Sequence, residues 1–203
     1  MQKADHWENV YRSKPFDSVS WYAPHLDESL RLIQQLTPNR NAAIVDIGGG
    51  ESTLVDDLLS LQYTDISVLD ISATAIEFTK QRLGARAEDV NWHVGDITEY
   101  DFGEKSFNLW HDRAVFHFLT EPAARQSYVD LVRRSVKSGG YVLMATFGPN
   151  GPLKCSGLDV VRYDNKSLHQ EFGDEFNMMG SLLNEHGTPM GTNQQFLYCW
   201  CKK

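Results

Sequence analysis

The chain has 203 residues, 41% of them hydrophobic, which is enough for one domain with a sizeable core. Its net charge is −8 and no run of lysine or arginine exceeds two residues, so it lacks the basic footprint that nucleic acids require. No stretch approaches the roughly 20 apolar residues of a membrane span, and the N-terminus lacks the regions of a signal peptide. We therefore expect one cytoplasmic domain, residues 1–203, as a monomer or homodimer without a membrane or nucleic-acid partner.

Helical and strand patterns alternate along the chain, which predicts a mostly parallel α/β sheet covered by helices on both faces. The predicted helices lie at 24–36, 53–61, 72–83, 121–137 and 167–172, and the predicted strands at 43–47, 66–69, 91–94, 107–110, 141–146, 176–184 and 195–200. Ser72 is the expected cap of its helix and Gly84 its end, and Gly139-Gly140 is expected to end the longest helix. The last two strands should form a hairpin-like pair with a long connection at 185–193.

The segment from Ile44 to Thr53 reads as a buried strand, a glycine turn and a helix start. Gly48 and Gly50 fit the first two glycines of the dinucleotide motif G-x-G-x-x-G, but Thr53 occupies the third position. The Glu51 carboxylate would also lie where a pyrophosphate docks on the helix N-terminus. A cationic ligand without phosphates suits this turn better, because Asp46 stands at the strand end.

Carboxylates also follow the next two predicted strands. Asp70 stands about 20 residues after Gly50, where a carboxylate accepts hydrogen bonds from both ribose hydroxyls of a nucleoside. Asp96 could take an adenine amino group while Ile97 holds the ring. S-adenosylmethionine (SAM) carries a ribose, an adenine, an amine and a sulfonium, and it has no phosphate.

With Asp46-Ile47-Gly48-Gly49-Gly50, Asp70 and Gly95-Asp96-Ile97 in this order and spacing, the chain resembles the class I SAM-dependent methyltransferases over roughly residues 40–203. Ser52 departs from the third glycine that many members carry. The resemblance implies a three-layer Rossmann-like sandwich with a seven-stranded, mostly parallel sheet in the order 3-2-1-4-5-7-6. It also implies SAM as cofactor and S-adenosylhomocysteine as product. The expected cofactor-binding residues are Tyr11, Trp21, Asp46, Gly48, Gly50, Asp70, Ile71, Asp96, Ile97 and His111.

The N-terminal segment, residues 1–40, is rich in aromatic residues, and residues 41–203 are the expected SAM-binding core. The aromatic side chains of residues 1–40 are Trp7, Tyr11, Phe16, Trp21 and Tyr22. Aromatic faces attract a sulfonium by cation–π interaction, which predicts a helical lid over SAM. The alternative is a helix packed on the core, since Trp7 and Tyr11 stand four residues apart. We favour the lid because residues 18–22 continue without helical spacing.

Methyl transfer needs positioning and desolvation more than a catalytic group, so the candidates for chemistry are open. Asp112 either orients or deprotonates the acceptor, or accepts hydrogen bonds from the following turn. Arg113 either holds an anionic acceptor or pairs with Asp112. The candidate acceptor contacts are His117, Cys155 and His186, and each has the alternative of a packed or exposed structural residue. The sequence has no C-x-x-C spacing, and no metal is expected.

The acceptor itself is expected to be a small molecule that presents sulfur, oxygen or nitrogen. Residues 110–151 loosely resemble the thiopurine and thiol methyltransferase branch. The chain lacks the Asn/Asp-Pro-Pro-Tyr/Phe segment of enzymes that methylate exocyclic amines of bases. Two alternatives stay open: a protein lysine methyltransferase, which an acidic rim would favour, and a SAM-binding module without catalysis.

Overall fold

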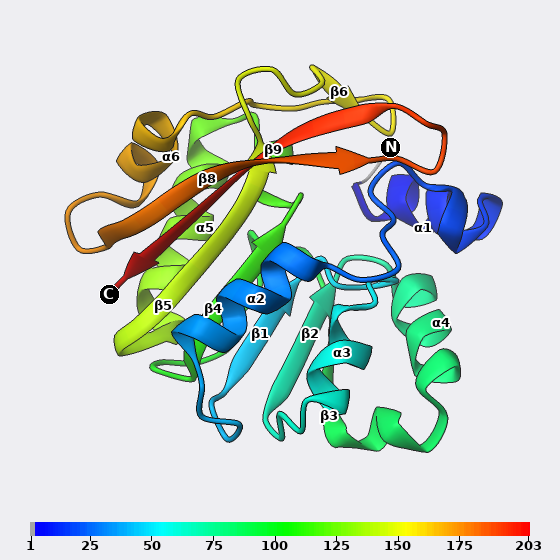
Figure 1. The fold of residues 1–203 in the computed structure, drawn as a ribbon, viewed down its shortest axis with the longest axis horizontal. Coiled ribbons are helices and arrows are strands. Elements are labelled where there is room, and N and C mark those ends of the chain that lie inside the picture. Colours follow the sequence, from blue (N-terminus) through cyan, green and yellow to red (C-terminus); the bar gives the residue numbers. More distant parts are fainter. Residues whose placement is uncertain (1–2) are drawn as a thin grey trace.

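A seven-stranded sheet in the order β3-β2-β1-β4-β5-β9-β8 forms the centre of the computed structural model, which describes residues 3–203 (Figure 1). Its strands are β1 Ile44–Ile47, β2 Ile66–Asp70, β3 Val90–Val94, β4 Phe107–Arg113, β5 Val136–Phe147, β8 Asn177–Gly187 and β9 Asn193–Lys202. Neighbouring strands from β3 to β5 are parallel, whereas β9 is antiparallel to β5 and to β8. With β8 and β9 as the sixth and seventh strands of this sheet, the predicted order is confirmed.

Helices cover both faces of this sheet, as the alternating pattern predicts. The helices are α1 Lys3–Ser13, α2 Asp27–Leu36, α3 Leu54–Ser60, α4 Ala73–Leu83, α5 Pro122–Ser135 and α6 Asn165–Phe172. Successive strand residues point to opposite faces, so Ile44 and Leu109 pack with α2, α3 and α4, whereas Val45 and Trp110 pack with α5 and α6. The chain therefore has the predicted three layers, and each layer boundary is a separate apolar core.

The predicted ends of α4 are confirmed. The Ser72 hydroxyl accepts a hydrogen bond from the Ala75 backbone N–H at 3.2 Å, which satisfies one of the free donors at the helix start. Gly84 follows the helix with φ +59°, a backbone conformation that favours glycine. This cap matters for the site, because Ser72 begins the helix directly after the carboxyl end of β2.

Three of the differences from the predicted boundaries have a clear physical cause. The strand predicted at 107–110 continues to Arg113, because His111 and Asp112 are fully buried polar residues that pair with β5. The longest helix ends at Ser135 rather than Lys137, because the buried Val136 is already the first residue of β5 and pairs with Phe107 of β4. Strand β5 then runs through Gly139-Gly140, which were expected to end the helix. The expected long connection at 185–193 shortens to a turn at 188–192, since β8 and β9 pair out to Gly187 and Asn193.

Helix α1 lies above the carboxyl ends of β1, β2 and β4, beside the N-terminal turn of α4 (Figure 1). The Glu8 carboxylate accepts hydrogen bonds from the backbone N–H and hydroxyl of Thr74, and Arg12 Nε donates to the same hydroxyl at 3.2 Å. Val10 is the one buried residue of α1, so this helix belongs to neither core. None of the helices in residues 3–203 combines the length and the apolar character that a membrane crossing requires.

Candidate active site

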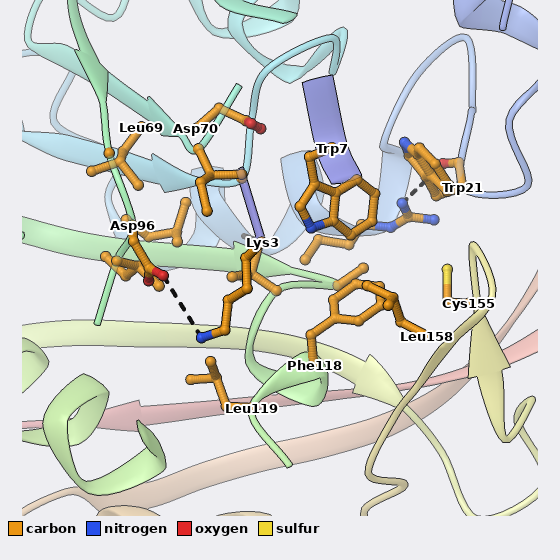
Figure 2. A pocket seen from close by; sticks show the side chains of 18 of the residues that line it. Lys3, Trp7, Trp21, Leu69, Asp70, Asp96, Phe118, Leu119, Cys155 and Leu158 are labelled. Atoms are coloured by element: carbon orange, nitrogen blue, oxygen red, sulfur yellow. Dashed lines mark hydrogen bonds and ion pairs between the residues drawn. The ribbon is translucent and has the colours of Figure 1, made fainter. Parts of the chain in front are cut away.

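A cavity of about 340 Å³ lies between α1 and the carboxyl ends of the parallel strands. We call it the main cavity. Its floor is Gly48 after β1, Asp70 and Ile71 at β2, Asp96 after β3, and Arg113 at the end of β4. The roof is Lys3, Trp7 and Tyr11, which follow one another at every fourth residue on one face of α1 (Figure 2). This volume falls in the range of small-molecule sites, and its place is where open α/β sheets bind their ligands.

Four aromatic rings form one wall of the main cavity. The Trp7 ring centroid lies 5.1 Å from that of Phe118 and 5.8 Å from that of Trp21, both in edge-to-face geometry. The Tyr11 centroid lies 6.4 Å from that of Trp21. These contacts join α1 to the segment before α2 and to the turn after β4, so the aromatic wall spans three distant parts of the chain (Figure 2).

An ion pair crosses the opposite end of the main cavity. The Lys3 ammonium lies 3.7 Å from Asp96 Oδ2, and a dashed line in Figure 2 marks this ion pair. The other oxygen of Asp96 accepts hydrogen bonds from the Thr98 backbone N–H at 2.9 Å and hydroxyl at 2.7 Å. Helix α1 thus contacts the floor through the Lys3 ammonium at one end and the aromatic wall through its rings at the other.

Asp70 is the buried carboxylate of the floor. One of its oxygens accepts from the Gly50 N–H at 3.1 Å and the other from the Ser72 N–H at 2.8 Å. Burial raises the pKa of this carboxyl to about 6, although the two N–H donors favour its ionised form. Each oxygen keeps a free lone pair, because a carboxylate offers about four acceptor positions in all.

The glycine turn leaves bare backbone at the floor. Gly48 has φ +69°, and a Cβ on it would lie 2.1 Å from a Val115 methyl carbon. A Cβ on Gly50 would lie 2.6 Å from Asp70 Oδ2. Both positions therefore exclude a side chain, and the main cavity reaches the backbone of Gly48 directly.

Asp46 and His111 do not line the main cavity. They line a smaller cavity of about 40 Å³ beside it, together with Glu51 and Arg113. His111 Nδ1 donates to Asp46 Oδ1 at 2.7 Å, and His111 Nε2 lies 2.9 Å from the Ser29 hydroxyl. Asp46 Oδ2 has no hydrogen-bond partner in the described part of the chain. Desolvation raises the pKa of Glu51 in the same small cavity to about 7.

Comparison with known proteins agrees with this geometry. Residues 44–140 match the methyltransferase domain family. The chain is 28% identical over 112 residues to the mouse eEF1A lysine and N-terminal methyltransferase, covering 55% of this chain and 16% of that protein. It is 26% identical over 156 residues to the malonyl-[acyl-carrier protein] O-methyltransferase of a Paenibacillus strain, covering 74% of this chain and 51% of that protein.

A solved structure shares the fold over nearly the whole chain. It is the 1,6-didemethyltoxoflavin-N1-methyltransferase of Burkholderia thailandensis with bound S-adenosylhomocysteine, at a TM-score of 0.70 and 16% identity, covering 98% of this chain and 83% of that one. Residues 44–140 thus match a methyltransferase domain, and the chain shares the fold of SAM-dependent methyltransferases. SAM is accordingly the cofactor against which we test this methyltransferase site.

The residues present fit that cofactor. Asp70 offers free carboxylate lone pairs for two vicinal hydroxyls, and Gly48 offers uncovered backbone. The unpartnered Oδ2 of Asp46 suits an ammonium group. Trp7, Tyr11 and Trp21 line the main cavity with aromatic rings, which would attract a sulfonium by cation–π interaction.

The predicted cofactor residues fall into three groups. Seven of them line the main cavity: Tyr11, Trp21, Gly48, Asp70, Ile71, Asp96 and Ile97. Asp46 and His111 face the small cavity. Gly50 lines neither cavity, and its N–H holds the Asp70 carboxylate instead.

The two predicted catalytic residues are separated. Asp112 is fully buried behind the floor, where it accepts from the backbone N–H of Val115 at 2.9 Å and from the Tyr128 hydroxyl at 2.6 Å. This location matches the alternative of a hydrogen bond to the following turn. Arg113 does not pair with Asp112; it lines both cavities and donates to the Trp21 carbonyl at 3.0 Å.

The predicted acceptor contacts are also dispersed. Cys155, in the short strand β6 (Lys154–Cys155), lines the main cavity, and burial raises its thiol pKa to about 11. His117 is fully buried; its Nδ1 accepts from the Phe147 N–H, and burial lowers its pKa to about 3. His186 lines neither cavity and donates to the Ser20 carbonyl at 2.9 Å. Within residues 3–203, acidic, cysteine and histidine side chains do not gather in threes as a metal site would require.

Several cavity residues were missed from the sequence. Phe118 lies in the 3-10 turn Phe116–Phe118 and Leu158 in the short strand β7 (Leu158–Asp159). Both line the main cavity from short elements that no local pattern distinguishes. Lys3 had a usable signal, because it precedes Trp7 by one helical turn on the face that forms the roof.

Proposed function

We propose that this protein transfers the methyl group of SAM to a small-molecule acceptor that presents sulfur, oxygen or nitrogen. When bound, SAM supplies an electrophilic methyl group on a sulfonium. The observation that carries the proposal is the main cavity itself: about 340 Å³, roofed by Trp7 and Tyr11 and floored by Asp70 and bare glycine backbone. A site of this size under a helical roof suits a small ligand better than a protein surface.

The contributions of the chain are positioning and exclusion of water. Asp70 and Asp96 orient the nucleoside end, since their carboxylates are fixed by backbone N–H and hydroxyl donors. The aromatic wall of Trp7, Trp21 and Phe118 covers the other end and keeps water from the reacting atoms. A displacement at carbon gains most from such alignment.

The main alternative is methylation of a lysine side chain in a protein. It is supported by the similarity to the mouse eEF1A lysine and N-terminal methyltransferase, although the chain spans only 16% of that relative's length. A cationic lysine would favour an acidic rim. The rim here is mixed, because Lys3 pairs with Asp96, and Lys154 pairs with Asp159 at 3.2 Å.

Tritiated SAM offered with a panel of thiols, phenols, amines and cell lysate tests the proposal. We expect label in small organic products. Label in protein bands alone would replace the small-molecule acceptor by a protein. SAM binding without transfer to any acceptor would support the third possibility, a SAM-binding module without catalysis.

A further inference from the structure

Arg113 is a half-buried cation in the main cavity without an acidic partner. Two other partly buried arginines, Arg82 and Arg125, pair with Asp56 at 2.7 Å and Glu171 at 2.8 Å. Within residues 3–203, no carboxylate lies within ion-pair distance of Arg113; its contacts are the Trp21 carbonyl at 3.0 Å and the Phe196 ring, whose centroid lies 4.5 Å from the guanidinium carbon. A cation withdrawn from water without a counterion is costly, unless a ligand supplies the charge.

The histidine and cysteine side chains around Arg113 do not supply a negative charge. Burial and the Arg113 charge together lower the pKa of His117 and of His186, so both imidazoles are neutral at pH 7. The thiol of Cys155 also stays protonated, because burial raises its pKa to about 11.

The carboxylates that share a cavity with Arg113 form no ion pair with it. In the main cavity, Asp96 is paired with Lys3, Asp159 is paired with Lys154, and Asp70 accepts from backbone N–H groups. In the small cavity, Asp46 accepts from His111, and burial raises the pKa of Glu51 to about 7.

The position of Arg113 also indicates which ligand it meets. Its guanidinium lies over Phe196 of β9, on the side of the fold that carries Cys155 and His186, and Arg113 also lines the small cavity beside the glycine turn. Asp70 and Asp96, which suit the nucleoside, lie at the ends of β2 and beyond β3, on the other side of β1. Asp70 and Asp96 therefore lie on one side of the main cavity and Arg113 on the other.

We propose that Arg113 binds the methyl acceptor as an organic anion, a thiolate, phenolate or carboxylate, and holds it ionised at the atom that takes the methyl group. This inference rests on the proposed function and names its acceptor class. The acceptor oxygen or sulfur gives an electron pair to the methyl carbon while the carbon–sulfur bond of the sulfonium breaks, and its electron pair stays on that sulfur. The negative charge of the acceptor cancels the positive charge of the sulfonium, so no proton moves and no general base is needed. A lysine ammonium is disfavoured beside Arg113, because both groups carry a positive charge.

The ionisation of a bound chromophoric acceptor tests this directly. The probes are 4-nitrophenol and 4-nitrothiophenol, whose anions absorb at longer wavelength than their acids, with 4-nitrobenzylamine as the cationic counterpart. They are titrated into the protein saturated with S-adenosylhomocysteine. We expect the bound anions to show an apparent pKa at least about one unit below that in water, which is the lower range for a neighbouring opposite charge. The amine should bind at least tenfold more weakly.

Arg113→Met should remove the pKa shift of the probe, and Arg113→Lys should retain part of it because the charge remains. The matched control is Arg40→Met, since Arg40 also lies 4.5 Å over an aromatic ring, that of Tyr63, but away from both cavities. Absence of anion binding, an unshifted probe pKa in the parent protein, or equal binding to Arg113→Met overturns the inference.

A second measurement separates the acceptor from the carboxylate of the cofactor. S-adenosylhomocysteine and 5′-methylthioadenosine, which lacks the amino-acid end, are both titrated into Arg113→Met. We expect both affinities within about twofold of the parent. A tenfold loss for S-adenosylhomocysteine alone would show that Arg113 serves the cofactor and would overturn the inference. If the parent protein itself bound neither S-adenosylhomocysteine nor 5′-methylthioadenosine, that result would instead contradict the proposed function.

Discussion

The buried imidazole of His111 donates a hydrogen bond to Asp46 Oδ1 at 2.7 Å, which fixes the orientation of the first carboxylate of the glycine-turn motif. Ser29 of α2 lies 2.9 Å from the other ring nitrogen, and the Tyr198 hydroxyl of β9 lies 3.2 Å from Ser29. This chain of contacts links the motif to two elements on the same face of the sheet. Asp46, His111 and Ser29 are hydrogen-bonded in the order of a catalytic triad. Ser29 is fully buried and lines neither cavity, however, so its hydroxyl has a structural role and is not a nucleophile.

Ser29→Ala should lower the free energy of unfolding by about 1–3 kcal/mol, because it leaves a buried ring nitrogen without its partner. Chemical denaturation measures this. Ser60→Ala is the control, since the Ser60 hydroxyl bonds a helix carbonyl at the surface and its loss should change little. An unchanged stability for Ser29→Ala would contradict the linked network.

Trp7→Ala should weaken SAM binding at least about tenfold. The change removes ring contacts to Phe118 and Trp21, and each aromatic pair is worth about 0.5–1.5 kcal/mol beyond its buried area. The free energy of unfolding should fall by no more than about 1–3 kcal/mol, the worth of these two pairs, because α1 contributes to neither core. Calorimetry checks the affinity, with the exposed Asn9→Ala of the same helix as control. Equal SAM affinity for Trp7→Ala would indicate that the helix packs without covering the cofactor.

Asp112→Ala should destabilise the fold by more than about 3 kcal/mol, because the backbone N–H groups of Val115 and Phe116 and the Tyr128 hydroxyl all lose their buried acceptor. Asp112→Asn, which keeps one oxygen, should lose less. In the folded Asp112→Asn variant we expect SAM affinity and methyl transfer close to those of the parent. A stable variant that binds SAM but transfers no methyl group would show that Asp112 acts on the acceptor.

The strand order followed only from the resemblance to the class I SAM-dependent methyltransferases, whereas the glycine turn and the place of Asp70 were predictable from local residue pattern and spacing along the chain. The extension of β4 was not, since His111 and Asp112 are polar and only their tertiary partners make them buried strand residues. The separation of Arg113 from Asp112 had the same origin. Neighbours in a strand point to opposite faces, and which face holds the cavity depends on the whole sheet.

The aromatic wall shows the same limit from the other side. The aromatic composition of residues 1–40 predicted a lid with Tyr11 and Trp21 as its contacts, and this lid stays a prediction. Phe118, which completes the aromatic wall, comes from a turn after β4. Contacts between segments this far apart follow from the strand order, and local spacing contains no record of them.

SAM affinity should fall as the pH is lowered through about 6. Burial raises the pKa of Asp70 from 3.8 to about 6, and its protonation removes lone pairs that accept the ribose hydroxyls. The sign for stability is opposite: the raised pKa contributes stability that is full below about pH 4 and lost as the pH rises through 6. Calorimetry between pH 5 and pH 8 checks the affinity.

Glu51 titrates nearby, since burial raises its pKa to about 7, so Glu51→Gln is the control for that profile. The step near pH 6 should persist in Glu51→Gln and vanish in Asp70→Asn. A step that disappears in Glu51→Gln and remains in Asp70→Asn would show that Glu51 titrates instead, and would contradict the assignment to Asp70.

The central claim is that the main cavity binds SAM through Asp70, and SAM titration of Asp70→Ala by calorimetry tests it most directly. Glu77→Ala, an exposed carboxylate of α4 outside both cavities, is the control for the loss of a charge. We predict at least about a hundredfold weaker binding for Asp70→Ala, since two hydrogen bonds to a charged group are worth about 3 kcal/mol or more, and unchanged binding for Glu77→Ala. Binding of SAM by a folded Asp70→Ala as tightly as by the parent would contradict the account.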